Sequence, residues 1–301
     1  MANMDLFGGL EKFGLKADDD KREIFAEEKK AAPVKKEEKK EEAAAAEPEK
    51  PEVKAPPETE FLFTKHIRCT VCEKVFEVKM VKSARVRRML PDFDLRPRFE
   101  NIDTLKYDVY ACPYCGYAAQ SRYFDHLTKG QVNLVKETIC ANFAPTMIDN
   151  SPTYDYETAI ARYQLALYNS IVKRGKNSEK AYTCLKLSWL YRSMADEMPE
   201  TTDEEKAKKA EAREYQEKYY KEAFDGFQKA LASEDFPMCG MDSYTMDYML
   251  AAIACHFKEY SFASKAVSNI LTSQMADRRI KDRALELKEQ IIKEIRKSAG
   301  Q

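Results

Sequence analysis

The sequence predicts an α+β protein, mainly α, in which a small β module is followed by a longer domain of repeated helices and preceded by a polar leader. Three features carry this prediction. Two Cys-x2-Cys pairs are flanked by short β-prone runs, a tract of Lys, Glu, Ala and Pro precedes them, and a repeated pattern of small and large apolar residues follows them. The 301 residues are enough for about two domains.

The leader divides into two parts. Residues 1–16 form a short apolar peptide, which suits either a docking peptide, for a partner or for the protein's own helices, or a frayed terminus. Its apolar residues are Leu6, Phe7, Leu10, Phe13 and Leu15. Residues 17–60 offer no apolar face to bury, so nothing offsets the entropy of ordering them. We expect this part to be a disordered linker.

The two cysteine pairs indicate a metal site. The predicted ligands are Cys69, Cys72, Cys112 and Cys115. Zn²⁺ prefers four soft or borderline ligands in a tetrahedron, and two Cys-x2-Cys turns supply four thiolates at suitable reach. Pro113 and Gly116 favour a tight second turn, whereas the first turn lacks both residue types and is expected to be looser. We predict Zn²⁺ as a structural cofactor, with a redox-active pair and coincidental core cysteines as alternatives.

The zinc-binding module is expected to span residues 61–124. Strand-like runs at 61–64, 75–81 and 107–111 give the order turn, strand, excursion, strand, turn. This order is typical of a zinc ribbon with a long insertion. Zinc binding would supply much of the folding free energy of so small a module.

The excursion between the two cysteine pairs is rich in cations. The candidate nucleic-acid contacts are Lys82, Arg85, Arg87, Arg88, Arg96 and Arg98. Interleaved aromatic residues such as Phe93 and Phe99 would add base stacking to the phosphate contacts. In the competing interpretation, the arginines pair with Asp92 and Asp94 or brace the loop on the helical domain.

Residues 125–298 are expected to form the helical domain. A large-x2-small-x3-large-x2-small pattern begins at Tyr156 and Tyr220, and a weaker copy begins at Tyr260. The small residues let neighbouring helices approach closely, and the large ones fill the space between them. The pattern resembles the tetratricopeptide repeat, whose paired helices stack into a solenoid, although the copies are unevenly spaced. An ordinary helical bundle is the alternative.

Composition limits the other functions. The net charge of −1 predicts no general attraction to nucleic acid or anionic membranes. No run approaches about 18 consecutive apolar residues, so no membrane span is expected. With no secretory signal visible and four of eight cysteines paired for metal, we expect a cytoplasmic location, where thiols stay reduced.

No catalytic constellation is visible in the sequence. There are only three histidines, and no Gly-rich phosphate loop or metalloprotease motif is present. We therefore expect a cytosolic zinc-binding adaptor, not an enzyme, whose helices bind an unidentified protein or peptide partner. The alternatives are a nucleic-acid-associated protein that uses the arginine-rich loop and, more distantly, a thiol-dependent redox enzyme. The sequence leaves the oligomeric state open.

Several motifs occur in a fixed order along the chain. They are Cys69-x2-Cys72-x3-Phe76-x2-Lys79, Ser83-x-Arg85, Asp92-x-Asp94, Arg96-Pro97-Arg98 and Tyr107-x4-Cys112-Pro113-x-Cys115-Gly116-Tyr117-Ala118. Together with the leader sequence LFGGLEKFGL, they resemble the bacterial family catalogued as domain of unknown function number 2225. This sequence differs at Thr70, where proline is expected, and at Asp103-Thr104, where Asn-Pro is expected. The resemblance implies a bacterial cytosolic protein with a zinc-ribbon-like module and a helical repeat tail, and it implies no particular activity.

Overall fold

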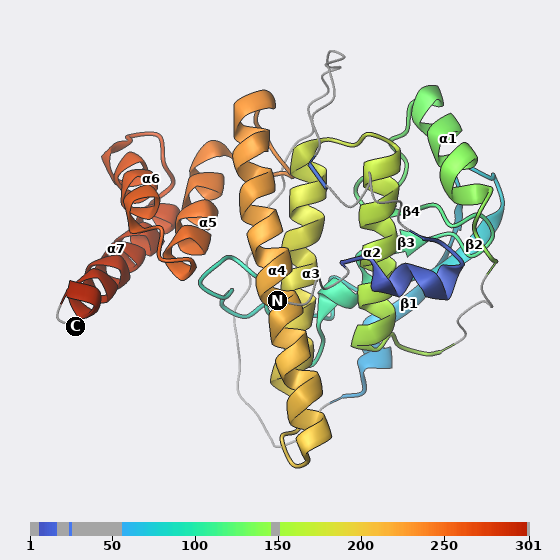
Figure 1. The fold of residues 1–301 in the computed structure, drawn as a ribbon, viewed down its shortest axis with the longest axis horizontal. Helices are drawn as coiled ribbons and strands as arrows, with labels where there is room; N and C mark the ends of the chain where they lie inside the picture. The colour runs from blue at the N-terminus through green and yellow to red at the C-terminus, as the bar shows by residue number, and fades with distance from the viewer. Residues whose placement is uncertain (1–5, 17–23, 26–55, 146–150, 300–301) are drawn as a thin grey trace.

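The computed structural model describes residues 6–16, 24–25, 56–145 and 151–299. Most of the predicted linker, residues 17–23 and 26–55, lies outside the described residues, as do residues 1–5 of the leader. The described chain is mainly helical, with a small β part (Figure 1). The predicted α+β, mainly α, class is therefore confirmed.

Two antiparallel hairpins make up the β part, and each hairpin contains one cysteine pair at its turn. The strands are β1 (Leu62–Arg68) paired with β2 (Val75–Val81), and β3 (Val109–Ala111) paired with β4 (Ala118–Gln120). The run at 75–81 forms a strand over its full length. Of the run at 61–64, residues 62–64 begin the longer strand β1, whereas Phe61 ends the 3₁₀ helix η3 (Glu58–Phe61). The run at 107–111 is shorter than predicted, because the 3₁₀ helix η4 (Thr104–Tyr107) occupies its beginning.

β4 was not predicted. Its sequence, Ala-Ala-Gln, has low intrinsic strand propensity, so the hairpin geometry after the second turn creates the strand. Both cysteine turns therefore lie inside hairpins, and the two hairpins form separate two-stranded sheets.

Seven α-helices follow the hairpins in the described residues. They are α1 (Lys129–Val135), α2 (Tyr156–Val172), α3 (Asn177–Glu197), α4 (Asp203–Ser233), α5 (Ser243–His256), α6 (Tyr260–Thr272) and α7 (Arg278–Ala299). Caps fix where several of them begin, because a side-chain oxygen satisfies a free backbone N–H of the first turn. Asp155 accepts from Thr158 N, and Asp242 accepts from Thr245 N.

From α2 onward, consecutive helices lie against one another, and the array ends at α7, far from the hairpins (Figure 1). The three copies of the apolar pattern fall on α2, α4 and α6, with α3 and α5 between them. The small residues Ala159, Ala223 and Ala263 are fully buried at these contacts. This alternation is the one expected for paired helices, while the assignment to tetratricopeptide-like repeats stays a prediction.

The second hairpin packs directly on α2, since β3 and β4 both lie against this helix. Tyr117, next to β4, and Tyr163 of α2 are fully buried in one continuous hydrophobic core. Tyr163 also donates to the carbonyl of Leu105, 3.1 Å away. The modules predicted at 61–124 and 125–298 therefore share a core.

The described part of the apolar N-terminal peptide packs on the protein's own helices. Its central turn is the 3₁₀ helix η1 (Gly8–Phe13), which lies across α2 (Figure 1). Leu6, Phe7, Leu10 and Leu15 are buried. Residues 6–16 are therefore docked on the protein's own helices and do not form a frayed terminus.

None of the described helices is both long and apolar enough to cross a bilayer.

Candidate metal centre

The two cysteine turns have the same backbone hydrogen bonds. Cys69 N donates to Lys74 O over 2.9 Å, and Cys112 N donates to Tyr117 O over 2.8 Å. In each turn, the residue after the second cysteine donates back to the carbonyl of the first cysteine, at 2.9 Å and 3.1 Å. The first turn is therefore not the looser copy that we expected from its sequence.

The returning donor in each turn has a left-handed backbone. It is Glu73, with φ 62°, in the first turn and Gly116, with φ 74°, in the second. Glycine reaches this conformation without steric cost, whereas other residues do so at a cost of about 1–2 kcal/mol. The side chain of Glu73 is exposed and pairs with Arg68 at 2.8 Å. The hairpin and its hydrogen bonds thus impose the same turn on two different residues.

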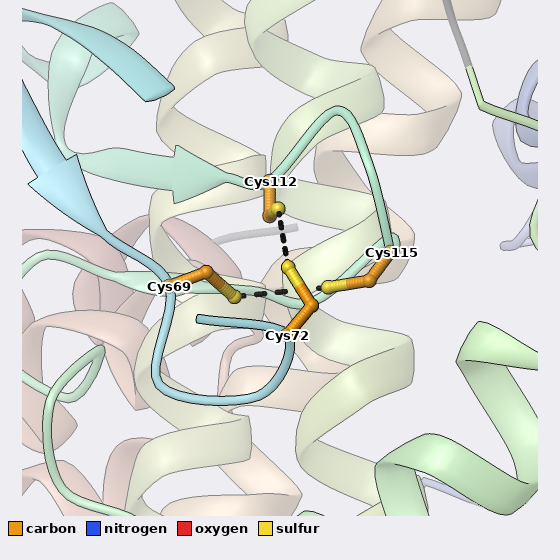
Figure 2. Close-up of side chains that lie close together, drawn as sticks. All are labelled: Cys69, Cys72, Cys112 and Cys115. Atoms are coloured by element: carbon orange, nitrogen blue, oxygen red, sulfur yellow. Dashed lines mark hydrogen bonds between the residues drawn. The ribbon is translucent and has the colours of Figure 1, made fainter. Parts of the chain in front are cut away.

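The turns bring all four predicted ligands together, with their side chains directed at a common point (Figure 2). The Sγ atoms of Cys69 and Cys115 are 3.7 Å apart, and those of Cys72 and Cys112 are 3.6 Å apart. All four Sγ atoms lie within 4.8 Å of one another. A tetrahedral ion with metal–sulfur bonds of about 2.3 Å places its sulfurs about 3.8 Å apart. The four cysteines could therefore hold a metal ion.

The pKa shifts of Cys69 and Cys115 have opposite directions, as expected for thiols that share protons at one site. Hydrogen bonds from Cys112 and Cys115 lower the pKa of Cys69 to about 2. The pKa of Cys115 is raised because it shares protons with Cys112, Cys140 and Cys69 and because it is buried. Both shifts arise from sulfur–sulfur hydrogen bonds within the cluster, which favour a thiolate at Cys69 and a protonated thiol at Cys115. A bound cation would replace the thiol protons and stabilise the thiolates.

A single backbone carbonyl connects the two turns. The oxygen of Phe124 accepts from Tyr117 OH at 3.0 Å, and also from Thr70 Oγ1 at 3.3 Å. Tyr117 follows the second cysteine pair, and Thr70 lies inside the first. The loop after β4 therefore holds the two turns in register, independently of any metal.

Helix α2 and the segment after η5 (Lys136–Cys140) support the second turn from behind. Asn169 Nδ2 of α2 donates to Gly116 O over 3.0 Å. A Cβ atom added at Gly116 would lie only 2.4 Å from the ring of Phe143. Glycine is thus required at this position both by the backbone angle and by the close approach of Phe143.

A fifth cysteine, Cys140, lies beside the four predicted ligands, and its sequence position did not predict this. Cys140, at the end of η5, shares a hydrogen bond with Cys115 that lowers the pKa of the Cys140 thiol. It belongs to no Cys-x2-Cys pair, so no spacing signal marks it in the sequence. Only the packing of η5 against the second turn brings it near.

The predicted nucleic-acid contacts differ in their exposure and in their acidic partners. Arg96 is buried, and its guanidinium lies 3.5 Å from Asp103 and 3.7 Å from Asp92. A side chain buried in this way cannot touch a nucleic acid, so Arg96 is excluded from the candidate contacts. Arg98 lies 3.6 Å from Asp92, and Arg87 lies 3.8 Å from Glu100. Such exposed or half-exposed pairs contribute little to stability, and they reduce the free positive charge of the loop.

The remaining candidates lie nearer the surface. Arg85 and Arg88 are exposed, and Lys82 is half-buried with its Nζ 3.1 Å from Glu60 O.

A buried aspartate anchors the excursion to the helices. Asp94 is 4 % exposed and accepts from Trp189 Nε1 at 2.9 Å, from Tyr220 OH at 3.0 Å and from both Nη atoms of Arg192. Burial alone would raise the pKa of this carboxyl, but the charge and hydrogen bonds of Arg192 outweigh burial and lower it. Asp94 therefore stays ionised and connects the loop to α3 and α4.

The hairpins, the four-thiol cluster and the helical array together define a mainly helical α+β protein with a four-cysteine candidate metal centre. Residues 62–291 match the family described as "Uncharacterized protein conserved in bacteria (DUF2225)". The chain belongs to this family, which confirms the resemblance drawn from the ordered motifs. Neither the comparison with curated proteins nor the comparison with solved structures gave a match.

Proposed function

We propose that this protein is a cytosolic adaptor, stabilised by a structural zinc ion and without catalytic activity, that binds a protein or peptide partner through tetratricopeptide-like helices. The cysteine set supports zinc, because four thiolates are a ligand set that Zn²⁺ prefers and the sulfur–sulfur distances fit its tetrahedron. Four protein ligands also fill the usual coordination of zinc, which favours a structural ion over a catalytic one.

One observation carries the adaptor role. Buried polar side chains of α2 and α4 bind the backbone of an apolar segment that is far away in the sequence. Gln164 Nε2 and Tyr219 OH both donate to the carbonyl of Leu6. Helices that hydrogen-bond the backbone of such a segment through buried side chains have the features of a peptide-binding surface.

Metal content tests the zinc part of the proposal. The protein, purified without added metal, is expected to contain about one zinc per chain, and Cys69→Ser and Cys115→Ser are each expected to lose it. Cys255→Ser is the matched control, because this cysteine is buried in α5 away from the cluster. Protein that carries no metal and oxidises in pairs at Cys69/Cys115 or Cys72/Cys112 would contradict structural zinc and favour thiol redox chemistry.

Capture from a bacterial lysate separates the adaptor from the nucleic-acid alternative. The bait is the full chain, compared with the triple variant Arg85/Arg87/Arg88→Ala, whose changes lie on the exposed part of the excursion. An adaptor captures the same dominant protein with both baits after nuclease treatment. Bound RNA or DNA that is released by salt and lost in the triple variant would overturn the adaptor and support the alternative.

A further inference from the structure

The N-terminal segment contacts the helices in the manner of a bound peptide. Its Leu6 carbonyl accepts from Gln164 Nε2 of α2 at 3.1 Å and from Tyr219 OH of α4. Gln164 and Tyr219 also bond to each other at 3.2 Å, and both side chains are buried. Hydrogen bonds to a backbone carbonyl give affinity without depending on the side chain at that position.

Apolar side chains supply the specificity of this contact. Leu6, Phe7 and Leu10 are all buried, which gives the segment a Leu-Phe-x-x-Leu pattern. The ring of Phe7 meets Tyr168 of α2 edge-on, with 6.1 Å between the ring centroids. At the far end, Tyr168 OH also bonds to the carbonyl of Lys16 at 3.4 Å.

Glycine lets the segment approach α2 closely. A Cβ atom added at Gly9 would lie 1.9 Å from Oε1 of Gln164, so Gln164 would have to leave its hydrogen bonds. A Cβ atom added at the neighbouring Gly8 would meet nothing within 4 Å. The contact with α2 therefore requires glycine at position 9 but leaves room for a side chain at position 8.

A second contact follows on α4. Phe25 is buried against Gly226, where an added Cβ atom would lie 2.0 Å from the Phe25 ring. Lys229 Nζ donates to the Phe25 carbonyl at 3.3 Å, and the ammonium groups of Lys180 and Lys229 lie 5.4 and 5.5 Å from the ring centroid. Glycine is unfavourable in the middle of a helix, so Gly226 is best explained by the ring that it admits.

We propose that this surface, formed by Gln164, Tyr168, Tyr219, Gly226 and Lys229, is a peptide-binding site that the chain's own N-terminal segment occupies. A partner with a Leu-Phe-x-x-Leu segment displaces it. This proposal deepens the proposed function, on which it rests for the existence of a partner. The segment is joined to the hairpins through residues 26–55, which are rich in Lys, Glu, Ala and Pro, so it remains tethered when displaced.

Tethering predicts strong competition within one chain. Covalent linkage at an effective concentration of about 1 mM means that a segment with an intrinsic Kd of about 10 µM would weaken the binding of an external peptide about 100-fold. The wild-type chain should therefore bind such a peptide poorly, whereas a chain that cannot dock its own segment should bind it well.

The probe is a fluorescent peptide of residues 1–25, and binding is measured by anisotropy. The full chain with Leu6→Asp and Leu10→Asp cannot bury its own segment and is expected to bind the probe at least tenfold more tightly than wild type does. A probe with Gly9→Ala is expected to bind about tenfold more weakly because Gln164 loses its hydrogen bonds. A probe with Gly8→Ala is the matched control and is expected to bind like the original.

A change on the helices tests the second contact. In the Leu6→Asp, Leu10→Asp chain, the further change Gly226→Ala favours the helix but fills the space of Phe25. It is expected to weaken the binding of the probe of residues 1–25 and to leave the binding of a shorter probe of residues 1–16 unchanged. Equal binding of all probes, or no binding to a variant that keeps its metal and helicity, would overturn the proposal.

Hydrogen exchange of the wild-type chain covers the case in which the double variant does not fold. A docked peptide opens independently of the core, so the amides of Leu10 and Leu15 should exchange at least 100-fold faster than buried amides of α2. Equal rates would show that the segment is an inseparable part of the fold and would overturn the proposal. Probe binding without capture of any protein partner would instead count against the adaptor function and leave this site intact.

Discussion

The two cysteine turns share their backbone hydrogen bonds but differ in what surrounds them. The second turn is enclosed: β3 and β4 pack on α2, Asn169 binds Gly116 O, and Phe143 covers the glycine. The first turn is more open, with Glu73 exposed and Cys72 only half-buried. The four sulfurs nevertheless converge from both turns. The shared turn therefore sets the geometry of the ligands. The side chains packed around each turn decide which residue is allowed at its left-handed position.

The two hairpins also differ in how they are attached to the helices. The second hairpin is part of the main core through Tyr117 and Ala118. The first hairpin also reaches this core, through Val71, Phe76 and Val78, but its strands do not pack on α2 as β3 and β4 do. It is further attached by the hydrogen bond of Thr70 to the Phe124 carbonyl and by the excursion that Asp94 anchors on α3 and α4. We therefore expect the first hairpin to depend more on the metal and on Asp94.

The largest expected effect is that of metal removal. Structural zinc contributes on the order of 10 kcal/mol to small metal-dependent folds, so a chelator should destabilise both hairpins. Hydrogen exchange should then rise more in β1 and β2 than in β3 and β4, because α2 still covers the second hairpin, while the helices α2–α4 stay protected. An equal rise of the exchange rates in both hairpins would contradict the expected difference in metal dependence. No rise in either hairpin would argue against a structural metal.

The next effect is that of Asp94→Asn. Removing the charge of Asp94 takes away the nearest carboxylate of Arg192 and leaves only Asp92, 3.8 Å away, to compensate it, which costs about 3 kcal/mol in the free energy of unfolding. Urea denaturation measures the loss, and Asp92→Asn is the matched control, because Asp92 is only partly buried and should cost much less. Similar losses for both variants would contradict a special role for Asp94.

The same pair gives a pH dependence. The folded pKa of Asp94 lies below its usual value of 3.8, so its contribution is present above that value and is lost as the pH falls through the folded pKa. The stability difference between wild type and Asp94→Asn should be constant from neutral pH down to about pH 5 and should narrow below about pH 4. A difference that stays constant into strong acid would show that Asp94 is not ionised in the folded protein.

The smaller effects concern the left-handed positions. Gly116→Ala forces a Cβ into both an unfavourable backbone angle and the ring of Phe143, at a cost of about 2–4 kcal/mol in the free energy of unfolding. Thermal unfolding and metal affinity measure the change together, and Gly130→Ala is the control, since an added Cβ there meets nothing within 4 Å. A loss no larger at Gly116 than at Gly130 would contradict the enclosed second turn.

Glu73→Gly is the counterpart in the open turn and has the smallest expected effect. Relief of the left-handed strain is offset by the greater freedom of glycine in the unfolded chain and by loss of the exposed Arg68 pair, so stability should stay within about 1 kcal/mol of wild type. A large destabilisation, measured by the same unfolding assay, would mean that the first turn is as constrained by its neighbours as the second.

The amino-acid sequence by itself determined much of this architecture. Ligand spacing identified the four cysteines, because each Cys-x2-Cys pair is a local turn whose sulfurs face one way. The alternating apolar and polar residues at 75–81 predicted a strand, and the repeated apolar pattern predicted the helices α2, α4 and α6. Both patterns are periodic within a single element and can therefore be recognised in the sequence.

Only the tertiary structure decided the features that depend on distant partners. Asp94 and Arg96 look like any other charged residues of a basic loop until Trp189, Arg192, Tyr220 and Ser193 surround them. β4 exists because a hairpin partner is present, and Cys140 reaches the centre because η5 packs there. The docking of Leu6 and Phe25 on α2 and α4 likewise depends on contacts across most of the chain. Periodicity and spacing report local geometry, whereas burial and ion pairing are set by whatever the folded chain brings near.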